Sequence, residues 1–396
     1  MAPNAVKDDR SQAELELEAR VRRTVDLQIK RGEQLGIQVA VYRHGRQIVS
    51  VAAGDAGFRD APQPIREDSV FSSFSVTKGV GAAAVHMLAD RGELDVNDPV
   101  AKYWPGFAKN GKGAITIAEA LSHQGGLYRM PRPLTTEFFA DWDAGIRWIE
   151  DLEPAWTPGT RSGMHALSWS WVCGGIVDHV VGKRIDRFVR EDIAEPLGIA
   201  DEFLFGIGDR AEGRLTRLRS VKAEGAVAGG VAAKPFPPDH PIFDAMPPDS
   251  DVNFNDDRIR RAVAPGANGH FSARALARFY GALAHTGEVD GARLLSEAYL
   301  PRLLEVQVEG IDAVTEVPLR KGVGFLLGGV VEQVYGPIGP NHESFGHTGN
   351  GGAVAFGDAS RGIGVALTLN LLKSVPNQLN PAMDICEQIR AGVDAL

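Results

Sequence analysis

The chain has 396 residues, 44% of them hydrophobic and 23% charged, which is typical of a globular protein with a large core. Its formal charge of −9 argues against nucleic acid as the main partner, because there is no basic surplus to neutralise phosphates. It has two cysteines, Cys173 and Cys386, so a disulfide framework is not expected.

The N-terminal residues 1–23 are polar and charged and lack the apolar core of a signal peptide. No stretch of the sequence is long and apolar enough to cross a bilayer. We therefore expect a cytoplasmic protein with no membrane partner, with an unusual export route as the alternative.

The first half of the chain begins with a charge-rich segment, residues 12–34, whose apolar positions recur at helical spacing and predict an amphipathic surface helix. Residues 36–54 then form two β-type runs with a turn at His44-Gly45. A helix is predicted from Ser75 to Gly92, with an apolar face formed by Val80, Ala84, Met87 and Leu88.

The middle of the chain is richer in loops and helical pattern. Residues 115–127 predict a helix closed by Gly125-Gly126, and residues 184–199 predict another, stopped by Pro196 and Gly198. Residues 201–265 are rich in Pro and Gly with little periodicity, which indicates long loops around a cleft.

The end of the chain is rich in β pattern. A predicted helix at 272–287 leads into apolar runs at 322–331 and 346–370, and residues 381–396 are again helical in pattern. Strand patterns at both ends indicate an α+β fold, with one antiparallel sheet built from the two ends and flanked by helices. The expected domains are 1–72 with 275–396, and a helical, loop-rich insertion at 73–274, with the active site between them.

Two short motifs carry possible chemistry. In Ser75-Val76-Thr77-Lys78 the serine and the lysine are three apart, so on a helix they share a face and Lys78 can reach the Ser75 oxygen. A lysine in a dry site has a lowered pKa and can take the proton that a serine must lose to become a nucleophile. Taken alone, this pattern is more often an ordinary helix start with a solvated lysine.

The second motif, Phe-Gly-His-Thr-Gly-Asn-Gly-Gly at 345–352, lies between two β runs. Its glycines allow a ligand to approach backbone N–H groups closely. Alone, it would be read as a Gly-rich hairpin with an incidental histidine. A third candidate, His123, is expected to have a capping or structural role.

Together with Leu-Ala-Asp-Arg-Gly-Glu-Leu at 88–94, Trp-Thr-Pro-Gly-Thr at 156–160 and the segment 268–283, these motifs occur in a joint order that resembles the serine β-lactamase and penicillin-binding-protein superfamily. The resemblance runs from about residue 30 to 390 and is stronger to the esterase branch, the β-lactamase-fold carboxylesterases and related acyltransferases. It implies a β-lactamase-like fold.

The resemblance also implies residue roles. Ser75 would be acylated with the help of Lys78, and His347, on the opposite wall of the cleft, would be the third catalytic residue. Thr348 and Gly349, next to it on that wall, would bind substrate. The backbone N–H groups of Ser75 and, by position, Asn350 would form the oxyanion hole. The substrate would be a small-molecule ester, amide or thioester, and no cofactor is implied.

One position departs from this pattern. Where the superfamily has a tyrosine that relays protons, this chain has Met164, followed by His165 and Ala166, and a methionine has no proton to give. Lys78 would then act alone, or His165 or another residue would substitute. Alternatively, the reaction is an acyl transfer in secondary metabolism whose leaving group needs no protonation, or the protein is an inactive member that only binds. We place Met164 and His165 on the substrate-binding wall.

Two further expectations complete the analysis. The ten histidines show no HxH or HxxxH spacing, so no metal site is predicted. The aromatic segment 169–171 is expected to form core and cleft wall, with Trp169 contacting an apolar acyl group. The oligomeric state is not predicted.

Overall fold

The computed structural model describes residues 10–208, 211, 213–222, 236–374 and 381–396. Its centre is an eight-stranded sheet. Each strand of this sheet runs antiparallel to its neighbours. In spatial order the strands are β2 (Arg46–Gly54), β1 (Gly36–Arg43), β14 (Ile363–Leu369), β13 (Val354–Asp358), β12 (Ser344–Thr348), β11 (Leu326–Leu327), β10 (Pro318–Lys321) and β9 (Val308–Ile311).

The two ends of the chain meet within this sheet, one strand in from the β2 edge. β1 pairs with β14 so that Val39 lies opposite Leu367, and β1 continues into β2 through the turn at His44 and Gly45, both of which have positive φ. The sequence-based prediction of one antiparallel sheet from both chain ends is thereby confirmed. The domain boundaries at 72/73 and 274/275 stay a prediction.

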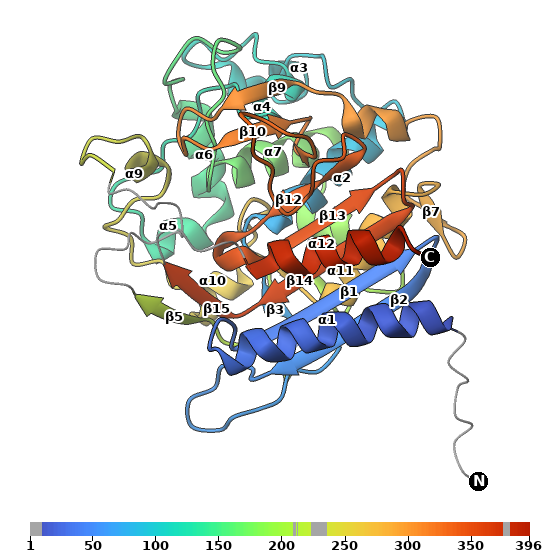
Figure 1. The fold of residues 1–396 in the computed structure, drawn as a ribbon. Coiled ribbons are helices and arrows are strands. Elements are labelled where there is room, and N and C mark those ends of the chain that lie inside the picture. Colours follow the sequence, from blue (N-terminus) through green and yellow to red (C-terminus); the bar gives the residue numbers. More distant parts are fainter. Residues whose placement is uncertain (1–9, 209–210, 212, 223–235, 375–380) are drawn as a thin grey trace.

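Alternating side chains sort the sheet into two faces. Val39 and Val41 of β1 belong to a core cluster with residues of α1 (Gln12–Lys30) and α12 (Pro381–Val393), and Figure 1 shows these two helices lying side by side across the sheet. Ala40, between them in sequence, belongs to the larger core cluster. That cluster contains α2 (Val76–Asp90) and α11 (Ala273–Leu283), so it lies on the opposite face.

The remaining helices are α3 (Val100–Tyr103), α4 (Ile117–Leu121), α5 (Thr136–Ala140), α6 (Trp142–Asp151), α7 (Trp169–Val181), α8 (Ile185–Phe188) with a π-helical turn at Val189–Ala194, α9 (Ile242–Ala245) and α10 (Asp257–Arg261). Several of them pack on α7, which itself packs against α2. Short 3-10 turns cover Pro105–Ala108, Leu300–Leu304 and Asn350–Gly352. The small sheets are β3 (Phe71–Ser72) with β6 (Gly269–Phe271) and β4 (Phe203–Phe205), β5 (Arg219–Lys222) with β15 (Leu371–Ser374), and β7 (Glu288–Val289) with β8 (Ala292–Arg293).

Two sequence-based predictions need correction. The helix predicted at 115–127 is only Ile117–Leu121, because His123 adopts φ +68° and the chain turns away before the glycines. The helix after Ser75 was expected to have one apolar face, but α2 is buried on every side from Val76 to Leu88, since both the sheet and α7 pack against it. A helix that is apolar all round is typical of a protein interior.

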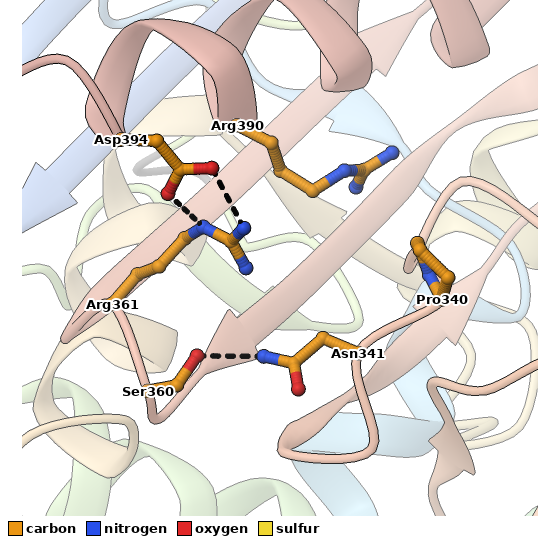
Figure 2. A pocket seen from close by; sticks show the side chains of 6 residues that line it. All are labelled: Pro340, Asn341, Ser360, Arg361, Arg390 and Asp394. Atoms are coloured by element: carbon orange, nitrogen blue, oxygen red, sulfur yellow. Dashed lines mark hydrogen bonds and ion pairs between the residues drawn. The ribbon is translucent and has the colours of Figure 1, made fainter.

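A polar hollow beside α12, shown in Figure 2, is not a candidate active site. Its arginines are already paired, because Arg361 binds Asp394 and Arg390 donates to Glu387 and to the carbonyl of Pro337. These contacts attach the C-terminal helix to the sheet. No described helix is long and apolar enough to serve as a transmembrane span.

Candidate active site

Ser75 lies at the first turn of α2, where the chain leaves β3. The turn is held by β6, because the Ser73 N–H donates to the Gly269 carbonyl at 2.9 Å and the Gly269 N–H donates to Thr77 Oγ1 at 2.9 Å. Phe74, directly before the serine, has φ +47°, a conformation that a bulky residue rarely adopts. Strained backbone of this kind clusters at functional sites.

Lys78 is fully buried and reaches the serine one helical turn away. Its Nζ lies 3.0 Å from Ser75 Oγ, 2.8 Å from the Ala166 carbonyl oxygen and 2.6 Å from the Gly266 carbonyl oxygen. A neutral amine has two N–H groups and one lone pair. The two carbonyls bind the two N–H groups, so the lone pair is left facing the serine hydroxyl, which is the arrangement of a general base.

The surroundings of Lys78 favour this neutral form. Burial disfavours the charged ammonium and lowers the pKa of Lys78 to about 7, with the distant thiol of Cys173 opposing only weakly. The ring centroid of Trp169 lies 6.0 Å from Nζ. The neutral amine, which can act as a base, is therefore accessible near neutral pH.

The end of β12 approaches the serine turn closely. A side chain at Gly349 would place its Cβ 2.5 Å from the Ser73 carbonyl oxygen and 3.3 Å from Val76 Cγ2. Only glycine therefore fits at this contact without moving the strand or the turn. His347, Thr348 and Asn350 line one cleft together with Ser75.

His347 is neutral in this arrangement. Its Nδ1–H donates to the Thr348 carbonyl at 2.7 Å, and Nε2 has no hydrogen-bond partner. Burial, reinforced by Lys78, lowers the pKa of His347 to about 3. The strand that faces Ser75 thus carries a neutral hydrogen-bonding group.

The cleft itself has a volume of about 1180 Å³ and extends from Ser75 past β10 and β11 to the loop 329–339. Most of its large side chains are apolar, among them Phe74, Leu134, Phe254, Leu319, Leu327 and Ile338. At the outer lip Val317, Val334 and Tyr335 are 40%, 52% and 40% exposed. A site of this size and lining suits an uncharged organic molecule.

Comparison with known proteins identifies the family. The beta-lactamase family model matches residues 21–385. The chain belongs to the beta-lactamase family. It is 33% identical to the esterase/beta-lactamase LipL of Mycobacterium tuberculosis over 358 residues, which cover 86% of this chain and 78% of LipL.

Two solved structures resemble this family member over nearly its whole length. A penicillin-binding protein homologue from Caulobacter crescentus has 31% sequence identity and a TM-score of 0.84, covering 97% of this chain and 98% of that one. A family VIII carboxylesterase has 28% identity and a TM-score of 0.81, covering 95% of this chain and 97% of that one. The predicted β-lactamase-like fold is confirmed.

Met164 lines the cleft, as expected, and its position is fixed by a buried ion pair that was not expected. The Met164 N–H donates to Asp312 Oδ1 at 3.1 Å, and Asp312 pairs with Lys321, whose Nζ also donates to Ser162 Oγ at 2.7 Å. Both charged groups are almost completely buried. Burial alone would raise the pKa of Asp312, but Lys321 and the hydrogen bonds outweigh it and lower that pKa.

Two residues predicted to contact substrate do not line the cleft of this beta-lactamase family member. His165 is fully buried, accepts a hydrogen bond from the Leu127 N–H at 3.0 Å, and burial lowers its pKa to about 3. Trp169 is also fully buried and donates to the Leu121 carbonyl at 3.2 Å. The sequence could not distinguish their inward direction from a cleft-facing one.

His123 takes the structural role expected of it. Its Nδ1 accepts a hydrogen bond from the His165 N–H at 3.1 Å, and its carbonyl accepts one from the Gly163 N–H. These bonds position the segment that supplies Met164 and the Ala166 carbonyl. Among the residues that the structure describes, no group of three or more His, Cys, Asp or Glu side chains could hold a metal ion.

Proposed function

We propose that the protein hydrolyses carboxylic esters through an acyl-enzyme on Ser75. The observation that carries the proposal is the contact of 3.0 Å between Lys78 Nζ and Ser75 Oγ, made by a buried amine with two N–H groups already bound to carbonyls. The names of its relatives, an esterase/beta-lactamase and a carboxylesterase, support the same chemistry.

In the proposed reaction Lys78 takes the hydroxyl proton as Ser75 Oγ attacks the substrate carbonyl. The backbone N–H groups of Ser75 and Asn350, from the two sides of the cleft, hold the developing oxyanion. One donor of this kind contributes about 3 kcal/mol in subtilisin. The bond from the acyl carbon to the alkoxy oxygen then breaks, the alkoxy group leaves with the electron pair, and the Lys78 ammonium passes its proton to solvent. Water attacks the acyl-enzyme with neutral Lys78 again as base, the bond from the acyl carbon to Ser75 Oγ breaks, and the proton returns to Ser75 Oγ as the acid is released.

Ester hydrolysis is favoured over β-lactam hydrolysis by the charge of the opposite strand. Because His347 is neutral, it places no cation beside Thr348 that would attract the carboxylate of a β-lactam. The apolar lining of the cleft likewise suits an uncharged ester.

Acyl transfer to an acceptor other than water is a second candidate. A volume of about 1180 Å³ leaves space for an apolar alcohol or amine beside a short acyl group. The two reactions share the acyl-enzyme and differ in whether added acceptor diverts product from the free acid.

The test is covalent labelling of the folded protein. Incubation with a fluorophosphonate or a 4-nitrophenyl ester, followed by intact mass and peptide mapping, is expected to show one adduct on Ser75. Ser75→Ala is expected to show none, and Lys78→Ala to label at least about 100-fold more slowly. An absent adduct in the wild type would overturn the proposal in favour of a protein that only binds.

A further inference from the structure

Among the residues that the structure describes, the site contains a base for Ser75 but no side chain placed to give a proton to the group that leaves. Among the described residues, Lys78 is the side chain that hydrogen-bonds to Ser75 Oγ. After it takes the serine proton, its three N–H groups face Ser75 Oγ and the carbonyls of Ala166 and Gly266. None of the three is left for a leaving group.

His347 does not fill this gap. Its one ring proton, on Nδ1, is bound to the Thr348 carbonyl at 2.7 Å, and Nε2 carries no proton to donate. Burial holds its pKa at about 3, so the imidazolium that could act as an acid is not formed near neutral pH.

The other titratable residues of the described cleft wall are bound elsewhere or lack a contact with the reacting groups. These are Glu33, Arg320, Tyr335 and Lys373. Arg320 pairs with Glu309 at 3.2 Å and donates to the Gly328 carbonyl. Neither Ser75 Oγ nor Lys78 Nζ is hydrogen-bonded to any of the four.

Met164 lies on the wall of the cleft that contains Ser75. It lies two residues before Ala166, whose carbonyl binds Lys78, and it lines the same cleft as Ser75. Its half-buried side chain packs against the apolar cluster of Tyr128, Ala166 and Val314. This part of the cleft wall, two residues from the carbonyl that binds Lys78, is therefore occupied by a side chain that cannot donate a proton.

Given the acyl-enzyme chemistry proposed above, we infer that the substrates of this site are esters whose leaving group departs as a stable anion, namely aryl esters, enol esters and thioesters. The acid that the site lacks would have to stand at position 164. The bond from Ser75 Oγ to the acyl carbon forms, and the bond from that carbon to the phenolate, enolate or thiolate breaks. The serine proton passes to Lys78 and then to water in the cleft, and the anion leaves with the electron pair.

The test measures how the rate of acyl-enzyme formation depends on the leaving group. Wild-type protein is mixed with 4-nitrophenyl, phenyl and ethyl butyrate, and the acyl-Ser75 species is quantified by quenched-flow mass spectrometry. The rates are expected to fall along this series at least as steeply as those of the same esters with hydroxide. A clearly shallower dependence would overturn the inference, because it would reveal a proton donor in the site.

A pair of variants locates the missing acid. Met164→Tyr is expected to raise the ratio of the acylation rate with ethyl butyrate to that with 4-nitrophenyl butyrate at least about tenfold above the wild-type ratio, since general acids contribute about 100-fold or more. Met164→Phe, which has the same ring without the hydroxyl, is expected to give no such selective gain. Equal effects of Tyr and Phe, in variants with wild-type thermal stability, would overturn the assignment to position 164.

This outcome is separable from a failure of the proposed function. If no ester yields an adduct on Ser75, the acyl-enzyme proposal itself falls. If alkyl and aryl esters both acylate Ser75 at similar rates, ester hydrolysis stands and only the leaving-group inference is wrong.

Discussion

Lys78 Nζ lies 3.0 Å from Ser75 Oγ and is held there by the carbonyls of Ala166 and Gly266. The amine is shielded from solvent, which lowers its pKa to about 7. The proposed nucleophilic role of Ser75 therefore implies that its reactivity depends on pH through the protonation of Lys78.

The first prediction concerns the pH profile of acylation. Because only the neutral amine can accept the serine proton, kcat/KM for ester acylation should rise tenfold per pH unit below about 7 and level off above it. His347 stays neutral over this range, so no second limb is expected from it. Stopped-flow measurement between pH 5 and 9 checks this, and Lys78→Ala is expected to lose the plateau. A midpoint near the ordinary lysine value would contradict the prediction.

The second prediction concerns stability and pH. The folded pKa of Lys78 is depressed below its unfolded value, so between about 7 and 10.5 the unfolded chain binds more protons than the folded one. Lys78 therefore makes stability rise with pH across this window, by up to about 1.4 kcal/mol per unit. Urea unfolding of wild type and Lys78→Met should show a difference in unfolding free energy that changes by this slope. A difference independent of pH would contradict it.

The sequence indicated the fold well because the signals were local. The period-2 runs of β1 and β14 and the turn at His44 and Gly45 depend on neighbouring residues. The spacing of Ser75 and Lys78 likewise fixed their contact as soon as a helix formed there. These features need no knowledge of distant parts of the chain.

The rest of the site depends on tertiary contacts that cannot be predicted from the types of the residues that make them. The carbonyls of Ala166 and Gly266 bind Lys78 through backbone atoms that every residue carries. Asp312 directly follows β9 and Lys321 ends β10, and in the sequence both resemble ordinary surface charges until the fold buries them. Trp169 could have faced core or cleft, and only packing against α2 decides that it faces the core.

The third prediction tests the buried ion pair of Asp312 and Lys321. Asp312→Ala leaves the Lys321 ammonium buried without its partner, which should cost about 3 to 5 kcal/mol. Lys321→Met should cost less, because Asp312 keeps its hydrogen bonds from Met164, Val314 and Thr315. Chemical unfolding measures both.

The matched control for this prediction is an exposed pair. Asp151→Ala removes one of the two carboxylates that pair with Lys109, the other being Glu150. The Asp151 and Lys109 side chains are 70% and 51% exposed, so this change should cost less than about 1 kcal/mol. Equal losses for the buried and exposed pairs would show that the Asp312 pair does not hold the wall that carries Met164.

The fourth prediction tests the close approach of β12 to the serine turn. In Gly349→Ala the new Cβ would lie 2.5 Å from the Ser73 carbonyl oxygen, so the strand must move away from Ser75. Because a misplacement of about 1 Å costs on the order of 100-fold in rate, ester hydrolysis should fall by that order. Gly208→Ala, with open space around the new atom, is the control and should keep wild-type activity. Similar activity in both variants would contradict the proposed role of this contact.

The fifth prediction tests the apolar cleft as the binding site of the acyl chain. Each CH₂ group moved from water into the cleft contributes up to about 0.8 kcal/mol, or roughly fourfold in kcat/KM, so 4-nitrophenyl esters should improve from acetate towards octanoate. Val334 lines the outer cleft at 52% exposure, and Val330, at 51% exposure, lies outside the cleft lining. Val334→Ser should therefore reduce the preference for long chains while leaving the acetate rate unchanged, and Val330→Ser should leave the whole series as in wild type. If both serine variants behave alike, or if acetate is the preferred substrate of the wild type, the acyl chain does not run along this lip. The apolar surface there would then need another explanation.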